Sequence, residues 1–271
     1  GTGTVESTGE FAEVFNVVLP VVPEQSVTEG VSTSSIYDFI LDPKKLAPTL
    51  DKYSGMSFED GSTLYFKNEN GQFDFSSKSD VLTIKNKSTM DVNVEVNASL
   101  TGMDGIKLVN DNIFTNDKGA TVYLAMEDSN RKIAAIDKYG AFLKSTIPGC
   151  KEAYKIGYNA AIQKYAYELK SEAELQAENI QFSDYAFGLT GACNSANKWP
   201  DLNGVLEPRI TVVWTVTPRP DNVAPSIGKN KYAITTGRGV AIDVDLGSGN
   251  LAATGIKEIR FTRASGQVAV L

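Results

Sequence analysis

Hydrophobic and polar residues alternate most regularly between residues 78 and 100. Val, Ala and Leu occupy the even positions from 92 to 100, and Asn, Glu and Ser occupy the odd positions between them, as in a strand buried on one face. Leu82 and Ile84 show the same alternation ahead of a turn-forming cluster at residues 86–89. The stretch therefore predicts a two-stranded antiparallel unit, the building block of a β-sandwich.

The same alternation predicts further strands along the chain. They cover residues 36–41, 63–68, 72–76, 121–126, 132–137, 141–147, 182–190 and 209–217. The strands at 63–68 and 72–76 flank the hairpin signal Glu69-Asn70-Gly71. In the last strand Trp214 shares a face with Ile210, Val212 and Val216, which indicates a central strand with a large aromatic residue in the core.

Residues 151–181 carry two conflicting signals. Their Ala, Glu, Lys and Leu content favours a helix by intrinsic propensity. Tyr and Ile nevertheless alternate with polar residues over 154–158, and Tyr and Leu over 165–169, as in strands. We predict a β-hairpin formed by residues 154–159 and 164–170, followed by a short helix at residues 172–178.

The N-terminal region contains one apolar strand. Residues 1–12 are small and polar and indicate a leader or the start of an edge strand. Phe15, Val17, Leu19 and Val21 then alternate, and Pro20 places this strand at a sheet edge. Such a strand can pair within its own domain or be donated to a neighbouring copy, and the sequence leaves both alternatives open.

Proline content marks a boundary near the end of the strand that holds Trp214. Residues 218–225 contain three prolines and predict a linker between residues 1–217 and 226–271. The last part carries about four predicted strands, fewer than the seven of a closed immunoglobulin-like sandwich. The expected fold is therefore all-β and mainly antiparallel: a β-sandwich or jelly-roll-like domain followed by a small, partial immunoglobulin-like domain.

Composition removes several classes of function. The chain has no His among 271 residues, so Ser-His and Cys-His triads and most zinc hydrolase designs are excluded. A net charge of −7 argues against nucleic acid and anionic membrane surfaces as partners. The longest apolar run, residues 14–22, is too short to span a membrane. A cytosolic protein, a mature exported protein and a chain trimmed of its signal all remain compatible with the sequence.

The remaining candidate sites are few. Cys150 and Cys193 could form a disulfide in an exported protein or could be two buried thiols. Acidic residues at 104, 111 and 117 suggest calcium, but their spacing fits no EF-hand loop, so solvated turn residues explain them better. Tyr65, Phe66, Phe73 and Phe75 offer an aromatic platform for a glycan, although alternation places about half of them in the core. No catalytic carboxylate pair stands out.

Two stretches carry a resemblance to known proteins. Residues 81–106 and 187–202, with the strand 210–218 that follows, resemble exported surface proteins of Gram-positive bacteria, the group of WxL-type cell-wall proteins and the TasA and camelysin biofilm-fibre subunits. The Trp-x-Leu signature of the first family is absent, because Trp214 is followed by Thr215 and Val216, so peptidoglycan attachment is not implied. Residues 224–256 resemble the opening strands of immunoglobulin-like modules of bacterial surface proteins.

These resemblances imply an extracellular protein without catalytic activity or cofactor. The first hypothesis is a structural or adhesive surface protein, a fibre subunit of a biofilm matrix that assembles with other copies or with cell-surface components by strand donation. The alternative is a carbohydrate-binding module of a larger secreted protein.

Overall fold

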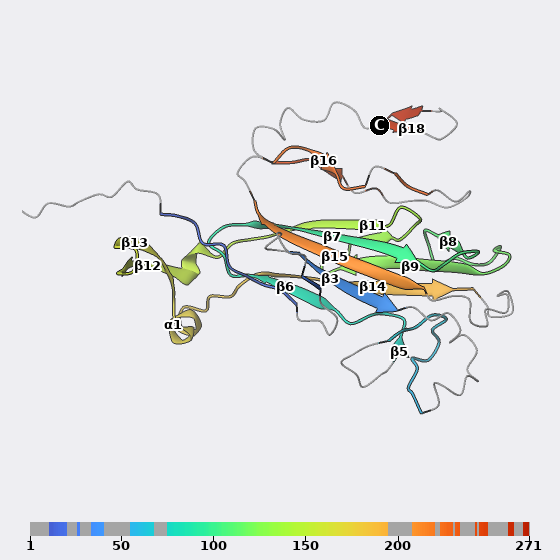
Figure 1. The fold of residues 1–271 in the computed structure, drawn as a ribbon, viewed down its shortest axis with the longest axis horizontal. Coiled ribbons are helices and arrows are strands. Elements are labelled where there is room, and N and C mark those ends of the chain that lie inside the picture. The colour runs from blue at the N-terminus through green and yellow to red at the C-terminus, as the bar shows by residue number, and fades with distance from the viewer. Residues whose placement is uncertain are drawn as a thin grey trace, which may run out of the picture.

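The computed structural model describes part of the chain. It covers residues 11–20, 26–27, 34–40, 55–67, 75–194, 208–219, 223–229, 231–233, 242, 244–248, 260–262 and 268–270. Nearly all of its elements are strands, and nearly all pairings are antiparallel (Figure 1). The predicted all-β class is therefore confirmed.

The first sheet has six strands. Along its main path lie β1 (Val17–Val18), β6 (Leu82–Asn86), β14 (Asp184–Cys193), β9 (Thr121–Asp128) and β10 (Ile133–Ala135), and β8 (Lys107–Val109) pairs with β9 in parallel. The long strands β14 and β9 form its centre, whereas the two-residue strand β1 forms one edge.

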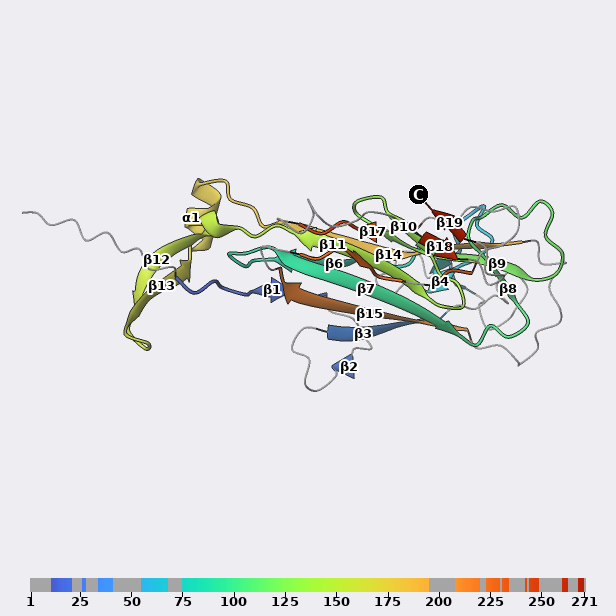
Figure 2. The same ribbon diagram turned by 90° about the horizontal axis from the view of Figure 1, so that it is seen from above.

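The second sheet has five strands and covers the first. Its order is β11 (Ala141–Ile147), β7 (Val92–Thr101), β15 (Arg209–Pro218), β3 (Ser34–Ile40) and β2 (Ser26–Val27). Ile84 and Leu124 from the first sheet and Val94 and Val96 from the second belong to one buried cluster, so the two apolar faces meet as in a sandwich (Figure 2).

The stretch from residue 78 to residue 100 forms two strands, but they do not pair with each other. β6 lies in the six-stranded sheet and β7 in the five-stranded sheet, so the predicted two-stranded unit is wrong. The chain instead crosses from one sheet to the other at residues 87–91. Both strands can then direct their apolar side chains into the same core.

The buried side chain of Asn86 holds this crossing in place. Its Nδ2 group donates to the backbone oxygens of Met90 (3.0 Å), Ile147 (3.0 Å) and Pro148 (3.1 Å), and its Oδ1 atom accepts from the Ser88 N–H at 2.9 Å. These bonds supply donors to backbone carbonyl groups around the crossing, as a buried backbone requires. The crossing is thus built around one amide side chain.

Trp214 lies in the centre of the five-stranded sheet and is completely buried. Ile210, Val212 and Val216 on the same strand are buried with it, as the alternation predicts. Its ring packs against Phe187 of the opposite sheet with ring centroids 5.8 Å apart. Among the described residues the indole N–H has no hydrogen-bond partner.

A hairpin and a short helix project from one end of the sandwich (Figures 1 and 2). The strands β12 (Tyr154–Asn159) and β13 (Lys164–Leu169) follow the 3₁₀ turn Lys151–Ala153 and precede the helix α1 (Glu172–Ala177). The prediction for this segment is confirmed, because tertiary pairing overrides the helix propensity of its residues. Ser171 and Glu174 form a capping box that starts α1.

The strands predicted at 63–68 and 72–76 do pair, as the short strands β4 (Phe66–Lys67) and β5 (Phe75–Ser76). The Glu69-Asn70-Gly71 turn between them lies outside the described residues.

After β15 the described strands are short and form two separate pairs. β16 (Ser226–Ile227) pairs with β17 (Val244–Asp245), and β18 (Arg260–Thr262) pairs with β19 (Val268–Val270). Within the predicted linker, the Arg219 N–H donates to the Asp91 oxygen and Val223 is buried. A partial immunoglobulin-like domain for residues 226–271 stays a prediction.

Candidate functional site

The N-terminal segment, residues 11–20, is held along the edge of the sandwich in extended form. Asn16 accepts a backbone bond from Lys87 at 2.8 Å, and Val14 accepts one from Thr89 at 3.1 Å. In return the Val14 N–H donates to the Thr89 hydroxyl at 2.8 Å and the Asn16 N–H to the Ser88 hydroxyl at 2.9 Å. β1 continues this contact by pairing with residues 85 and 86 of β6.

The apolar side chains of the N-terminal segment divide between two clusters. Val17 and Leu19 pack against the main core, and Val14 packs against a small cluster of Cys150, Ala153 and Tyr154. Of the four predicted assembly residues, Val17 and Leu19 therefore face the protein, Phe15 is exposed, and Val21 lies outside the described residues. Val14 was missed because it breaks the period-2 pattern.

One charged pair fixes the start of the N-terminal segment. The Glu13 carboxylate accepts from the Thr89 hydroxyl and lies 3.1 Å from the Lys151 ammonium. These two bonds, that of Thr89 first, lower the pKa of Glu13. The pKa of Lys151 rises to about 12 through hydrogen bonding to Tyr167 and then to Glu13. The segment is thus tied both to the sandwich and to the hairpin.

The two cysteines are free and are not joined in the structure. The Cys150 thiol lies against the Gln181 oxygen, ahead of β14, while Cys193 ends β14 and donates to the Thr63 oxygen at 2.7 Å. The full length of a ten-residue strand separates them, well beyond the reach of a disulfide. Of the two alternatives that the sequence left open, a disulfide and two buried thiols, the structure shows the second. Burial raises the pKa of both thiols, to about 12 for Cys193, so neither is a reactive nucleophile.

The aromatic platform considered for glycans is not exposed as a unit. Phe66 and Phe75 are buried in the structure, and Phe73 lies outside the described residues. Tyr65 is half-buried, and its hydroxyl donates to the Ser62 oxygen at 2.7 Å. Phe58 stacks on Phe75, so these rings pack against one another.

The acidic residues considered for calcium serve local turns. The Asp111 carboxylate accepts from the Ile113 N–H at 2.9 Å, and the Asp117 carboxylate pairs with Lys107 at 2.9 Å. Among the described residues, no three His, Cys, Asp or Glu side chains come close enough to hold a metal ion.

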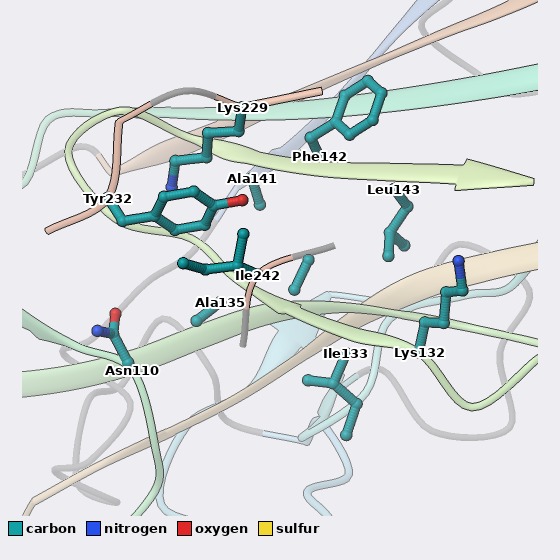
Figure 3. A pocket seen from close by; sticks show the side chains of 11 residues that line it. Asn110, Lys132, Ile133, Ala135, Ala141, Phe142, Leu143, Lys229, Tyr232 and Ile242 are labelled. Atoms are coloured by element: carbon teal, nitrogen blue, oxygen red, sulfur yellow. The ribbon is translucent and has the colours of Figure 1, made fainter. Parts of the chain in front are cut away.

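A cavity of about 350 Å³ lies between the sandwich and the C-terminal residues (Figure 3). Ile133, Ala135 and Leu143 line its sandwich side, and Tyr232 and Ile242 line the other. Its charged groups are already committed to structural bonds. Lys229 pairs with the buried Asp137 at 2.8 Å, and Asp137 also accepts from the Ala233 N–H at 2.7 Å. We therefore interpret the cavity as a gap in the packing between the sandwich and the C-terminal residues, and not as a ligand site.

The β12–β13 hairpin, which lies near the N-terminal segment, carries several exposed apolar side chains. Ile156, Tyr158, Ile162, Tyr165 and Leu169 are all exposed. The alternation in the sequence placed most of these side chains on one face, but it gave no sign that the face would be left open.

None of the protein-family models, curated proteins or solved structures compared with this chain matches it. The resemblance to exported surface proteins of Gram-positive bacteria therefore stays a prediction. Within the part of the chain that the structure describes, no helix has the length and apolar character needed to cross a membrane.

Proposed function

We propose that this protein is a non-catalytic structural or adhesive subunit outside the cell, at the surface of a Gram-positive bacterium, which joins copies of itself by strand donation. The observation that carries the proposal is the attachment of the N-terminal segment. Residues 14–18 bind the edge of the six-stranded sheet largely through backbone groups. Val14, Val17 and Leu19 add apolar contacts.

The edge of the sheet could bind this segment equally well from the same chain or from a second copy. Backbone hydrogen bonds and small apolar contacts do not depend on which copy supplies the strand, so the same segment of a neighbour would make the same bonds. β1 pairs with only residues 85 and 86 of β6, so the edge at residues 82–84 is open to a longer strand among the described elements.

The resemblance to fibre subunits supports the extracellular assignment. It falls on residues 81–106, 187–202 and 210–218, which include β6, β7, β15 and most of β14. These strands build the centre of the sandwich and the edge where the N-terminal segment binds. Peptidoglycan attachment is not proposed, since the Trp-x-Leu signature is missing.

Glycan binding is the second candidate, and two exposed tyrosines favour it. Tyr158 and Tyr165 lie at the outer end of the hairpin, where a sugar ring could stack. Their rings meet at 69°, however, so they form no flat platform for a sugar. Strand donation therefore has the stronger support.

Peptide exchange tests the proposal directly. A protease site placed within residues 21–25 lets the folded protein be cut, so that residues 11–20 are held by non-covalent contacts alone. A labelled peptide with the sequence of residues 11–20 should then replace the cut segment, as measured by fluorescence anisotropy. The matched control is the peptide with Val17→Asp, which would place a charge in the core and should not bind.

Two results would contradict the proposal. The first is a cut protein that stays folded and takes up neither peptide. The second is an uncut protein that shows no species above the monomer mass after unfolding and refolding at high concentration.

A further inference from the structure

One face of the β12–β13 hairpin is apolar, aromatic and without charge. Residues directly opposite in an antiparallel pair share a face. The cross-strand pairs Tyr154–Leu169, Ile156–Tyr167 and Tyr158–Tyr165 therefore lie together. We call these six side chains the tyrosine face.

The opposite face of the hairpin is polar. Its pairs are Lys155–Glu168, Gly157–Ala166 and Asn159–Lys164. Lys155 forms an ion pair with Glu174 of α1 at 2.9 Å, so the helix lies on the polar side. The hairpin is thus amphipathic. Leu175 of α1 packs against the buried cluster around Tyr154 at the base of the hairpin, whereas Tyr158 and Tyr165 at its tip are exposed.

Burial of the tyrosine face falls from its base to its tip. At the base Tyr154 is 8% exposed, and its hydroxyl donates to the Lys87 oxygen at 2.5 Å. Phe11 packs edge-on against Tyr167 with centroids 5.8 Å apart. At the tip Tyr158 is 59% exposed and Tyr165 is 63% exposed. Ile162, in the turn between the strands, is exposed as well.

A two-stranded hairpin with an open apolar face is marginally stable in water unless something packs on it. In the described structure β12 and β13 pair with no further strand. We therefore expect another surface to pack on this face.

Residues 1–10 are poorly suited to that task. They precede Phe11, which lies at the base of the tyrosine face, so they are within reach of it. Their sequence, GTGTVESTGE, contains one large apolar residue, Val5, against five exposed large apolar side chains. They could not bury the face.

A second copy of the same hairpin fits it better. None of the six side chains of the tyrosine face is charged, so two copies of a chain with net charge −7 can meet at its tip without bringing like charges together. The Lys151 ammonium lies over Tyr167, further toward the base. The hairpin projects from the end of the sandwich, so its face is accessible to a second molecule (Figures 1 and 2). A surface that is complementary to itself favours a two-fold contact.

The available area agrees with a weak but specific contact. Five large apolar side chains of the hairpin are exposed: Ile156, Tyr158, Ile162, Tyr165 and Leu169. Because one buried aromatic side chain covers about 150–250 Å², their exposed parts together offer roughly 500 Å² per copy. Two-fold pairing would remove about 1,000 Å² in all, which is near the lower limit for a specific interface.

We propose that the exposed side chains of the tyrosine face, together with Ile162, form a contact surface between two copies of this chain. Each hairpin covers the other about a two-fold axis. The exposed side chains of the face are Ile156, Tyr158, Tyr165 and Leu169. The contact goes beyond strand donation, since it uses the hairpin and not the edge of the sheet at β6.

Sedimentation velocity of the full chain tests the proposal over about 1 to 500 µM, the range expected for a contact of this size. The unaltered chain should form a dimer as the concentration rises. The double variant Tyr158→Thr/Tyr165→Thr keeps the strand propensity and removes the aromatic rings. It should weaken the dimer by about 100-fold, as for the loss of two central side chains.

The matched control lies beside Tyr165 on the same strand. Lys164→Thr introduces threonine on the polar face and should leave the dimer unchanged. Amide hydrogen exchange of β12 and β13 in both variants checks that the hairpin still forms.

Cysteine cross-linking tests the two-fold arrangement. Both native thiols are buried, so an introduced cysteine is the reactive one. Tyr158→Cys should form a disulfide between copies under mild oxidation, and Asn159→Cys should not. A dimer that persists while Tyr158→Cys forms no link would overturn the face-to-face contact.

Four other results would overturn the proposal. They are a chain that stays monomeric throughout, a dimer that the double variant leaves intact, dimers that form only after residues 1–10 are deleted, and a monomer that binds phosphatidylcholine vesicles through the tyrosine face. The double variant should still exchange the peptide of residues 11–20, so failure of this contact and failure of strand donation are distinguishable.

Discussion

The sandwich and the hairpin are built from the same kind of strand, but their apolar faces have different surroundings. Val94 and Val96 of β7 are completely buried, because the apolar face of the other sheet lies opposite. Tyr158 and Tyr165 of the hairpin alternate with polar residues in the same way, yet both are exposed. Alternation therefore predicts a strand and its apolar face, whereas burial depends on what packs against that face.

The base of the tyrosine face shows the transition between these two regions. Tyr154 belongs to a small buried cluster with Cys150 and Ala153, against which Val14 packs. Two cross-strand pairs further along the hairpin, the same face is open. Substitutions at covered positions should therefore cost more stability than substitutions on the open part of the hairpin.

Trp214→Ala should have the largest effect. Trp214 is completely buried between the two sheets, so the substitution leaves a large cavity and should cost about 3–5 kcal/mol of unfolding free energy. Urea denaturation measures this loss. A cost below about 1 kcal/mol would mean that the core does not close over this position as described.

Trp214→Phe is the matched control for that measurement. Because the indole N–H has no partner, phenylalanine removes an unsatisfied donor together with part of the ring volume. These two effects oppose each other, so the loss should be at most about half that of Trp214→Ala.

Asn86→Ala should have the next largest effect. It removes the donor that serves three backbone oxygens at the crossing between the sheets, and it should cost about 2–4 kcal/mol in chemical denaturation. Asn97→Ala, at an exposed position of β7, is the control and should change stability by no more than about 0.5 kcal/mol. Equal losses for the two variants would show that the Asn86 amide does not organise the crossing.

This crossing shows where sequence reasoning fails. The strands at 82–86 and 92–101 follow from local alternation, and β11 has the bounds that the sequence predicts. Whether two successive strands pair or separate depends on bonds from Asn86 to Ile147 and Pro148, about sixty residues later. Local patterns carry no information about such partners. The three-residue strand β8 was missed for a similar reason, since its pairing with β9 is its main support.

The same distinction applies to the candidate site. Val17 and Leu19 were identified because their alternation is local. Glu13 was missed because its partners Thr89 and Lys151 lie far along the chain. Val14 was missed because it breaks the local alternation and packs against a cluster that includes Cys150. The choice between a disulfide and two buried thiols stayed open because a spacing of 43 residues does not reveal that β14 lies between the two thiols.

The cap of α1 provides a smaller, pH-dependent effect. Hydrogen bonds from the Ser171 backbone, from Lys155 and from the Ser171 hydroxyl lower the pKa of Glu174 to about 2. This pKa lies below its unfolded value, so the stabilisation is complete above about pH 4.5 and is lost as the pH falls toward 2. NMR titration of the carboxyl carbon in Ser171→Ala should show the pKa moving up toward its ordinary value. The bonds from the Ser171 backbone and from Lys155 remain in this variant, so the rise should be partial, and an unchanged pKa would rule out the bond from the Ser171 hydroxyl.

The smallest effect on the isolated chain is expected at the tip of the hairpin. In dilute solution Tyr165→Thr should change the unfolding free energy by at most about 0.5 kcal/mol, because the side chain is already in water. Tyr154→Thr at the base of the same face should cost about 2–4 kcal/mol, because it removes a buried ring and its bond to Lys87.

The proposed contact between tyrosine faces makes the effect of Tyr165→Thr depend on protein concentration. If a second copy covers the tip, binding stabilises the unaltered chain as concentration rises, and Tyr165→Thr then becomes destabilising in concentrated solution alone. Thermal unfolding of both chains at low and high concentration measures this difference, and a Tyr165→Thr effect that is equally small at both would argue against the contact.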